Sequence, residues 1–397
     1  MAGQVPLEKD ALTRAEIELQ LERAREAFTG SPDSETARYA YANLLYQSGV
    51  FWQAWEIAKP FAEGAPAHEA SVGAAGGIAG KTAGSLSEGT GLAARLAFLL
   101  AKYETAERLY KAVAAGATDD DAARVRALLG LMFTWCEQDD FTSIRALEFP
   151  GGVQFPLHQA IKQFRGEPYQ LRWSREDRVS VVPFVMTDPL PLLMAELNGV
   201  PTALFFDTGA DTLIVDSDVA RAFGVEATAT GKGPFGGGLV ADFGYGQVES
   251  LMLADVELRN VPIMILPVKR LSGVYQDRGV ILGGAVGTAM LRQFLATLDY
   301  KRGRMVLRER SAAGKQKLDA ALAGKSTVEV PFVLDYTHLM MVRGSLHGKA
   351  GLTAFVDSGL AMEDCKFTVP PHTLSYLGIP EPERTYVHPV GGGGGSW

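Results

Sequence analysis

The stretch TALFFDTGADTLIVD, residues 202–216, decides the fold of the second half of this chain. An apolar run ends at Asp207, and Thr208 and Gly209 follow it directly. A carboxylate at the end of a buried strand, followed by a hydroxyl and by a glycine that admits a close backbone neighbour, is typical of a site made by two facing loops. The pattern therefore predicts a β structure with a second, matching loop elsewhere in the sequence.

That second loop occurs 150 residues later in the chain. TAFVDSGLA, residues 353–361, places Asp357, Ser358 and Gly359 where the first copy has Asp-Thr-Gly. VPFVM is echoed by VPFVL, AFGV by YLGI and PFGGG by PVGGG, in the same order along the chain. Four matches in order predict a duplicated β lobe.

Two aspartates that meet in this way have a defined chemistry. Like charges in contact do not both ionise, so the pair shares one proton. One carboxylate can then deprotonate a water molecule while the other donates a hydrogen bond to a carbonyl oxygen.

The segment 179–310 resembles the retropepsin-like and pepsin-like aspartic proteases, which are the established example of such proton sharing. The matching residues are DTGAD at 207–211, the glycine-rich segment GKGPFGGGLVADFGYG at 231–246, and Ile281-Leu282-Gly283 before LRQFLATLDYKRGRMVL. These elements stand in the order of one complete lobe of that family, and DTGAD followed by Thr-Leu-Ile-Val resembles its retroviral form. The resemblance implies an aspartic endopeptidase that needs no cofactor and no metal.

The resemblance also implies a role for individual residues. Asp207 and Asp357 would be the catalytic pair. The residues that support the active loops would be Thr208, Gly209, Ala210, Ser358, Gly359, Ile281, Leu282 and Gly283. A flap that closes over a peptide and excludes water would contain Phe235, Gly236, Gly237 and Gly238. In the second copy Leu360 and Ala361 replace the Ala-Asp of the first, which removes a polar group beside the site.

The first part of the chain belongs to a different structural class. From about residue 8 to residue 148 it is rich in Ala, Leu, Arg and Glu, with apolar residues at the spacing of amphipathic helices. The segments 42–62, 96–115 and 129–148 resemble degenerate tetratricopeptide repeats. A Gly/Ala/Ser-rich insert at 64–91 predicts a flexible loop.

We therefore expect a multidomain α plus β protein. An α-helical, tetratricopeptide-like repeat domain spans 1–148 and a linker spans 149–178. The all-β aspartic protease domain follows, with lobe 1 at 179–310 and an incomplete lobe 2 at 326–397. Strands are expected at 179–186, 192–197, 202–206, 212–216, 248–253, 261–266 and 304–309, and short helices at 217–224 and 287–295.

The second copy stops at GGGGGSW, residues 391–397, where a second flap should begin. We expect this chain to be a fragment of a longer protein, because a strand-poor lobe that ended there would expose sheet edges. One alternative is a vestigial second lobe, with Asp207 paired with its counterpart in a homodimer. Another is an inactive adaptor, in which the β domain binds peptides without cleaving them.

Composition narrows the function classes further. The formal charge of −8 gives no reason to expect nucleic acid as a partner, and no apolar run is long enough to predict a membrane span. The expected partners are a peptide or protein substrate, with a protein on the helical repeats or a second copy of the chain as further options. No signal peptide is visible, so the compartment stays open: cytoplasmic by default, or exported if a signal was removed.

The remaining sequence patterns give little support to any other function. AGGIAGKT, residues 75–82, fits a loose phosphate-loop pattern but lacks the flanking strand and helix, and GxGxxG at 231–236 is interpreted as part of the flap. Cys136 and Cys365 lie too far apart in sequence to suggest a zinc site, although one bridge between them stays open. The histidines are expected at the surface or in turns, at positions 68, 158, 338, 347, 372 and 388.

Overall fold

The computed structural model divides the chain into two compact units. Unit 1 comprises Met1–Gln154, Arg343–Ala354 and Val369–Glu381, and unit 2 comprises Phe155–Val342, Phe355–Thr368 and Pro382–Trp397. The structure describes residues 14–65, 83–118, 120–235, 240–268, 279–360, 367–369, 371–380, 391–392 and 395–396. Each unit is described by itself.

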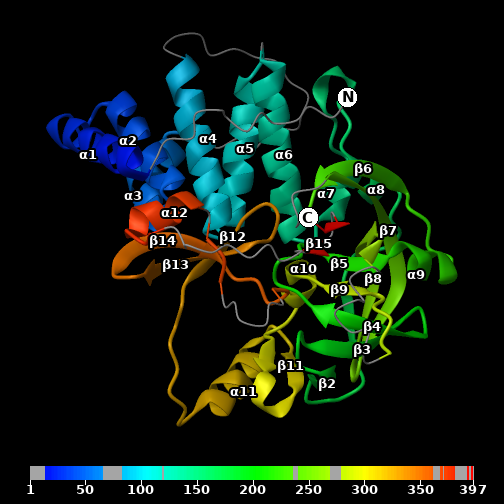
Figure 1. Ribbon diagram of the computed structural model, residues 1–397. Helices are drawn as coiled ribbons and strands as arrows, with labels where there is room; N and C mark the ends of the chain where they lie inside the picture. Colours follow the sequence, from blue (N-terminus) through cyan, green and yellow to red (C-terminus); the bar gives the residue numbers. More distant parts are fainter. Residues whose placement is uncertain are drawn as a thin grey trace. The chain divides into compact units, whose positions relative to one another are not determined.

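Helices make up most of unit 1 (Figure 1). Ser34 accepts a hydrogen bond from the Ala37 N–H at the start of the second helix, and Asp120 does the same for Ala123 at the start of the sixth, so side chains satisfy backbone donors there. The helices are α1 (Arg14–Gly30), α2 (Glu35–Gln47), α3 (Phe51–Glu63), α4 (Ala83–Leu99), α5 (Tyr103–Gly116), α6 (Asp121–Glu137) and α7 (Phe141–Arg145). The prediction of a helical first part is confirmed, whereas the repeat assignment stays a prediction.

The packing of α4, α5 and α6, which lie side by side in Figure 1, depends on small residues at their contacts. A Cβ on Gly130 of α6 would lie 2.4 Å from a ring carbon of Tyr110 on α5, so only glycine lets the aromatic ring come this close. The expectation of a loop over 64–91 is wrong from Ala83 onward, where α4 begins. The helix contacts α3 and α5 and buries Leu92, Ala93, Ala94, Leu96, Ala97 and Phe98, and this burial outweighs the glycines of the insert.

Unit 2 is built on a β-sheet. The strands are β1 (Gln170–Trp173), β2 (Val179–Met186), β3 (Leu192–Leu197), β4 (Val200–Phe206), β5 (Leu213–Asp216), β6 (Ala229–Pro234), β7 (Val240–Leu253), β8 (Val256–Leu266), β9 (Gly284–Val286), β10 (Thr297–Asp299) and β11 (Arg304–Arg308). All the strands expected from the sequence in this region are present. The additional ones, β1, β6, β9 and β10, are short or glycine-rich, so they carry too few alternating apolar positions to be recognised from the sequence.

Within the described residues these strands form a single sheet of 11, in the order β10-β11-β2-β3-β4-β9-β5-β8-β7-β6 with β1 paired to β8. Its core contains the inward residues of β2, β3, β4, β7 and β8, among them Val182, Leu197, Leu204, Leu251 and Leu258. One short helix, α8 (Pro156–Ile161), precedes β1, and α9 (Ser217–Ala222), α10 (Thr288–Leu291) and α11 (Ala312–Leu322) follow strands further along the chain. The helices expected at 217–224 and 287–295 correspond to α9 and α10.

Strand β9 lies between β4 and β5, and this order shapes the loop at Asp207. The chain leaves β4, passes the end of β9 and returns in β5, so residues 207–212 form a compact loop at the sheet end. The Asp207 N–H donates to the Val286 carbonyl at 3.1 Å, which fixes the start of the loop. A Cβ on Gly284 would lie 2.0 Å from the Ile214 carbonyl oxygen, so β9 requires glycine to fit there.

The loop that contains Asp357 follows the last strand of a smaller sheet. This sheet consists of β12 (Phe332–Leu334), β13 (Met340–Leu346) and β14 (Lys349–Phe355) in sequential antiparallel order. A helix, α12 (Pro371–Leu377), follows, and two short strands, β15 (Gly391–Gly392) and β16 (Gly395–Ser396), pair with each other. The duplication of the lobe stays a prediction.

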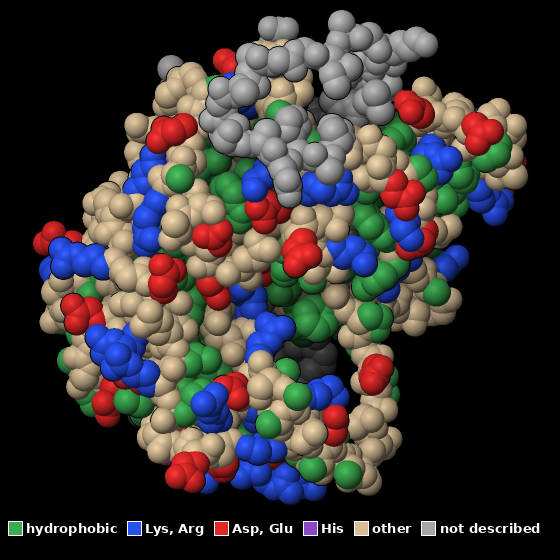
Figure 2. All heavy atoms as spheres, turned by 180° about the vertical axis from the view of Figure 1, so that it is seen from behind, with side chains coloured by type: hydrophobic (Ala, Val, Ile, Leu, Met, Phe, Trp, Pro, Cys, Tyr) green, Lys and Arg blue, Asp and Glu red, His purple; other side chains and the backbone are tan. Residues whose placement is uncertain are grey.

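Charged side chains of both signs are interspersed over the face drawn in Figure 2 and do not form a single basic patch there.

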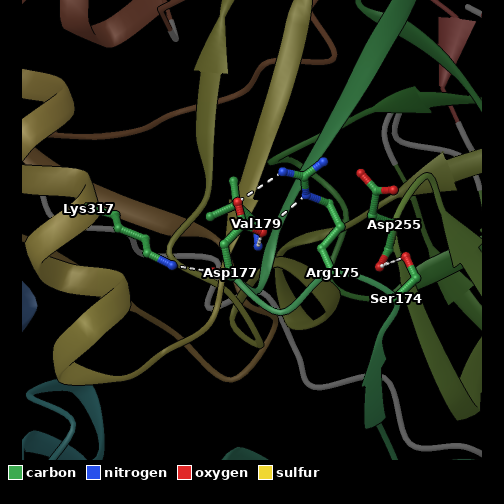
Figure 3. Close-up of polar contacts among 6 residues, drawn as sticks. All are labelled: Ser174, Arg175, Asp177, Val179, Asp255 and Lys317. Carbon is green, nitrogen blue, oxygen red and sulfur yellow. Dashed lines mark hydrogen bonds and ion pairs between the residues drawn. The ribbon is translucent and has the colours of Figure 1, made fainter.

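Polar contacts stabilise the loop that leads into β2 (Figure 3). The Arg175 guanidinium donates two hydrogen bonds of 3.0 Å to Asp177, which hold the pKa of that carboxyl below its usual range. Lys317 of α11 donates to the Asp177 carbonyl, so the loop is tied to the helix that follows β11.

Among the described residues, no helix combines the length and the apolarity that crossing a bilayer requires.

Candidate active site

The structure brings Asp207 and Asp357 to one place in unit 2. Asp207 follows β4 directly, and Asp357 comes two residues after β14. A Cβ built on Gly359 would lie 2.4 Å from Asp207 Oδ1, and one built on Gly209 would lie 2.9 Å from Asp357 Oδ1. Each carboxylate therefore lies against the glycine of the opposite loop, at a distance that only glycine permits.

Hydrogen bonds join the two loops reciprocally through their hydroxyl residues. Thr208 Oγ1 accepts from the Ser358 N–H at 2.9 Å and donates to the Val356 carbonyl at 2.6 Å. Ser358 Oγ accepts from the Thr208 N–H at 2.9 Å and donates to the Phe206 carbonyl at 3.2 Å. Each hydroxyl thus uses both its donor and an acceptor position across the contact. The arrangement has an approximate twofold symmetry and fixes the spacing of the loops.

Within each loop the glycine also orients its own aspartate. The Gly209 N–H donates to Asp207 Oδ1 and the Gly359 N–H donates to Asp357 Oδ1, both at 2.8 Å. One oxygen of each carboxylate is therefore held by the backbone. This restricts the rotation of both side chains and presents them in a fixed orientation.

The electrostatics of the pair follow from burial and proximity. Burial, and after it the charge of Asp357, raise the pKa of Asp207 to about 7, against the lowering effect of the Gly209 and Gly359 N–H groups. Two carboxylates in contact do not both ionise readily, since the second negative charge is repelled by the first. The pair therefore keeps one proton up to near-neutral pH, as general acid–base chemistry requires.

Of the predicted residues below the loops, Leu282 and Gly283 pack against β4. Leu282 is buried, and the Gly283 N–H donates to the Ala203 carbonyl at 2.8 Å. A Cβ on Gly283 would lie 2.3 Å from Thr202 Cγ2, so the glycine permits this contact. Ile281 differs from its neighbours, because 64% of it is exposed.

Ala210 is connected to α10. The Thr288 N–H and Oγ1 both donate to the Ala210 carbonyl, at 3.0 and 3.2 Å, and Thr288 Oγ1 also lies 3.0 Å from the His338 carbonyl. The Ala289 N–H donates to the Asp211 carbonyl at 2.8 Å. The start of α10 thus braces the far end of the first active loop.

Sequence reasoning missed Thr288 and His338 as neighbours of the site. Burial raises the pKa of Asp211, and the charge of His338 opposes this increase. Asp211 could have been found as the second acid of DTGAD, whereas no local pattern marks Thr288 or His338.

The prediction that the histidines lie at the surface or in turns is wrong for His158 of the short helix α8, which is buried and only 5% exposed.

The predicted flap is described only in part. Gly236, Gly237, Gly238 and, in the second loop, Ala361 lie outside the described residues. The strands β6 and β7 that flank the flap form an antiparallel hairpin, and the Phe235 ring makes an edge contact with Phe243 at 5.8 Å between centroids. This hairpin is the base of the predicted flap.

The described residues contain no group of three or more His, Cys, Asp or Glu side chains placed to hold a metal ion. Cys136 lies in α6, and Cys365 lies outside the described residues, so a bridge between the two stays untested. The phosphate-loop-like segment 75–82 also lies outside the described residues.

Comparisons with known proteins concern mainly the segment around the first loop. Residues 193–288 match the family described as "Aspartyl protease", a segment that contains the first active loop and Leu282-Gly283. A retropepsin-like aspartic protease from Rickettsia conorii matches with 14% identity over 36% of this chain and 96% of its own, at a TM-score of 0.24. Since that score is too low to establish a shared arrangement, the similarity rests on the family match over residues 193–288. No curated protein matches significantly.

The matched segment contains the loop that presents Asp207 in an Asp-Thr-Gly turn at the end of β4. Residues 193–288 of this chain are therefore similar to the aspartyl protease family.

Proposed function

We propose that the chain is an aspartic endopeptidase that hydrolyses peptide bonds with a water molecule activated by Asp207 and Asp357. The observation that carries the proposal is the reciprocal hydrogen bonding of Thr208 and Ser358, which brings the two carboxylates against the opposite glycines. The family match supports the same activity.

The chemistry follows from the shared proton. The ionised carboxylate removes a proton from a water molecule as its oxygen attacks the scissile carbonyl carbon, and the protonated carboxyl donates its proton to the carbonyl oxygen. The resulting gem-diol collapses when the amide nitrogen takes a proton from the pair and the C–N bond breaks. As the C=O bond re-forms, one hydroxyl of the gem-diol gives its proton to the other carboxylate, so the pair again holds one proton.

The intramolecular pair is preferred to the homodimer because Ser358 already makes the cross-loop bonds that a second copy of the first loop would otherwise supply. Cleavage of a mixed peptide library from acidic to neutral pH, with products identified by mass spectrometry, tests the proposal. Activity that rises with protein concentration beyond proportionality would support the homodimer, and peptide binding without cleavage would support the adaptor.

The pH dependence of catalysis is a first prediction. The active form holds one proton on the pair, and burial with the Asp357 charge raises the pKa of Asp207 to about 7. We therefore expect kcat/KM to fall as the pH rises through about 7. A pH profile of kcat/KM measures it, and a profile that stays level well above neutral pH would contradict it.

The same shift predicts a change in stability. The pKa of Asp207 is raised from 3.8 in the unfolded chain to about 7 in the folded protein, so the folded state binds more protons in that interval. The contribution of this group to the free energy of unfolding is therefore fully present at low pH and is lost as the pH rises through about 7. Urea unfolding of the unmodified chain and of Asp207→Asn should differ in this pH dependence, with Asp207→Asn showing the smaller decline.

The close approach of the loops gives a further prediction. In Gly359→Ala the new methyl group would lie 2.4 Å from Asp207 Oδ1, so the carboxylate must move. We expect a loss of about 10²-fold in kcat/KM with the fold retained, because small displacements of catalytic groups have effects of this size. Gly91→Ala, in α4 with no atom within 4 Å of the added carbon, is the matched control. Equal activity of the two variants would contradict the prediction.

A further inference from the structure

The sheet that leads to Asp357 has little core of its own. No residue of β13 or β14 is buried, and in β12 only Val333 is. A small sheet without a buried face needs packing against another element to be stable. Since β14 ends at Phe355, the order of this sheet determines where Asp357 lies.

The first contact that supplies this support lies at the end of α2. Arg343 Nη1 on β13 donates to the Ser48 carbonyl at 2.8 Å, and Ser48 is the C-cap residue of α2. The last carbonyls of a helix have no partner within the helix and carry partial negative charge. The guanidinium therefore satisfies a helix end and anchors β13 there.

The second contact is steric and follows directly after the first. Gly49 has φ +71°, and a Cβ at this position would lie 2.1 Å from Thr353 Oγ1 on β14. The turn between α2 and α3 thus approaches β14 as closely as the backbone allows. Glycine is required there both for its left-handed conformation and for this approach.

A third contact comes from α12, which follows the Asp357 loop in the chain. Tyr376 Oη donates to Glu18 Oε1 of α1 at 3.1 Å, and Lys349 Nζ of β14 lies 5.7 Å from the centroid of the Tyr376 ring. In agreement with these contacts, Arg343–Ala354 and Val369–Glu381 belong to the same compact unit as the helices. Figure 1 shows α12 and β14 beside α3.

We propose that the helices α1 to α3 form the support that holds β14, and through it the loop Asp357–Gly359, in the position needed for catalysis. Arg343 and Gly49 are positioning residues in this scheme, since they act through β14 and touch neither carboxylate. The helical part of the chain is then a structural component of the peptidase and not a separate binding module. The proposal rests on the proposed function for its catalytic consequence.

The test uses the full chain with two variants, each compared with a matched control variant. Arg343→Met removes the donor to Ser48 and keeps the apolar stem, whereas Arg343→Lys retains a cation. Gly49→Ala adds the methyl group that meets Thr353, whereas Gly151→Ala places the same residue at φ +65° with no atom within 4 Å. Hydrogen exchange of the amides at 349–359 and the steady-state kinetics of peptide cleavage are measured for each.

We expect exchange at 349–359 to be about 10-fold faster in Arg343→Met and Gly49→Ala than in Arg343→Lys and Gly151→Ala. We expect kcat to fall about 10-fold in the same two variants with little change in KM. Unchanged exchange in both variants, or faster exchange with kcat unaffected, overturns the proposal. If the unmodified chain cleaves no peptide, the proposed function fails, and exchange at the Ser358 and Gly359 amides still decides whether the helices hold the loop.

Discussion

Asp207→Asn and Asp357→Asn are each expected to lower kcat/KM for peptide cleavage by at least about 10³-fold. General acid–base catalysis by a positioned carboxyl contributes about 10²–10⁴-fold, and each substitution removes one half of a pair that works as a unit. An asparagine keeps the size and the acceptor oxygen but cannot exchange a proton. The bonds from Gly209 and Gly359 to the side-chain oxygens can be retained, so the fold should survive. Steady-state kinetics with a peptide found in the library measure the effect.

Asp218→Asn is the control for both variants. Asp218 is an exposed residue at the start of α9, where its carboxylate pairs with Arg221, and its loss should leave kcat/KM unchanged. If Asp357→Asn keeps full activity while Asp207→Asn has none, the intramolecular pair is wrong and the homodimer gains. If both variants cleave like the unmodified chain, the aspartic mechanism is excluded.

Removal of the cross-loop hydroxyl in Thr208→Val is expected to lower the free energy of unfolding by about 2 kcal/mol or more, since each buried polar group left without a partner costs about 1–3 kcal/mol. Val keeps the shape of Thr but leaves the Ser358 N–H and the Val356 carbonyl without their bonds of 2.9 and 2.6 Å. Because the same bonds fix the spacing of the carboxylates, kcat should fall as well. Urea unfolding and peptide cleavage measure the two effects.

Thr208→Ser restores the hydroxyl and is expected to recover most of the stability and activity. Thr230→Val, at an exposed position on β6, controls for the general effect of the substitution and should change stability little. If Thr208→Val were as stable as the unmodified chain, the cross-loop hydrogen bonds would not contribute as predicted, since Val retains the methyl group and lacks only the hydroxyl.

Much of the fold could be predicted because it depends on local pattern. The apolar spacing of three and four residues marks the helices of the first part, and alternation in segments such as VSVVPFVM marks strands with one buried side. The loop expectation over 64–91 is wrong for residues 83–91, which belong to α4, since glycine and alanine content alone does not show that Phe98 and its neighbours bury against other helices. Strand β9 was missed because three residues carry no periodicity.

The candidate site likewise has residues that the local sequence marks and residues that it does not. The two Asp-Ser/Thr-Gly turns could be read directly, because a carboxylate, a hydroxyl and a glycine in succession are adjacent in the chain and each has one strong geometric preference. Their roles in catalysis remain predictions that the variants above test. Thr288 and His338 could not be associated with the site from sequence, since they are separated from Ala210 by 78 and 128 positions respectively.

The sequence by itself determined where a carboxylate, a hydroxyl and a glycine follow one another, in the two Asp-Ser/Thr-Gly turns, and where most of the helices and strands form, because these properties depend on neighbouring residues. Only the tertiary structure decided that β9 lies between β4 and β5, that Thr208 and Ser358 exchange hydrogen bonds, and that the α2–α3 turn contacts β14. These arrangements join segments far apart in the chain. The free energy that selects them comes from burial and from the pairing of polar groups across the contact, and neither leaves a pattern in the local sequence.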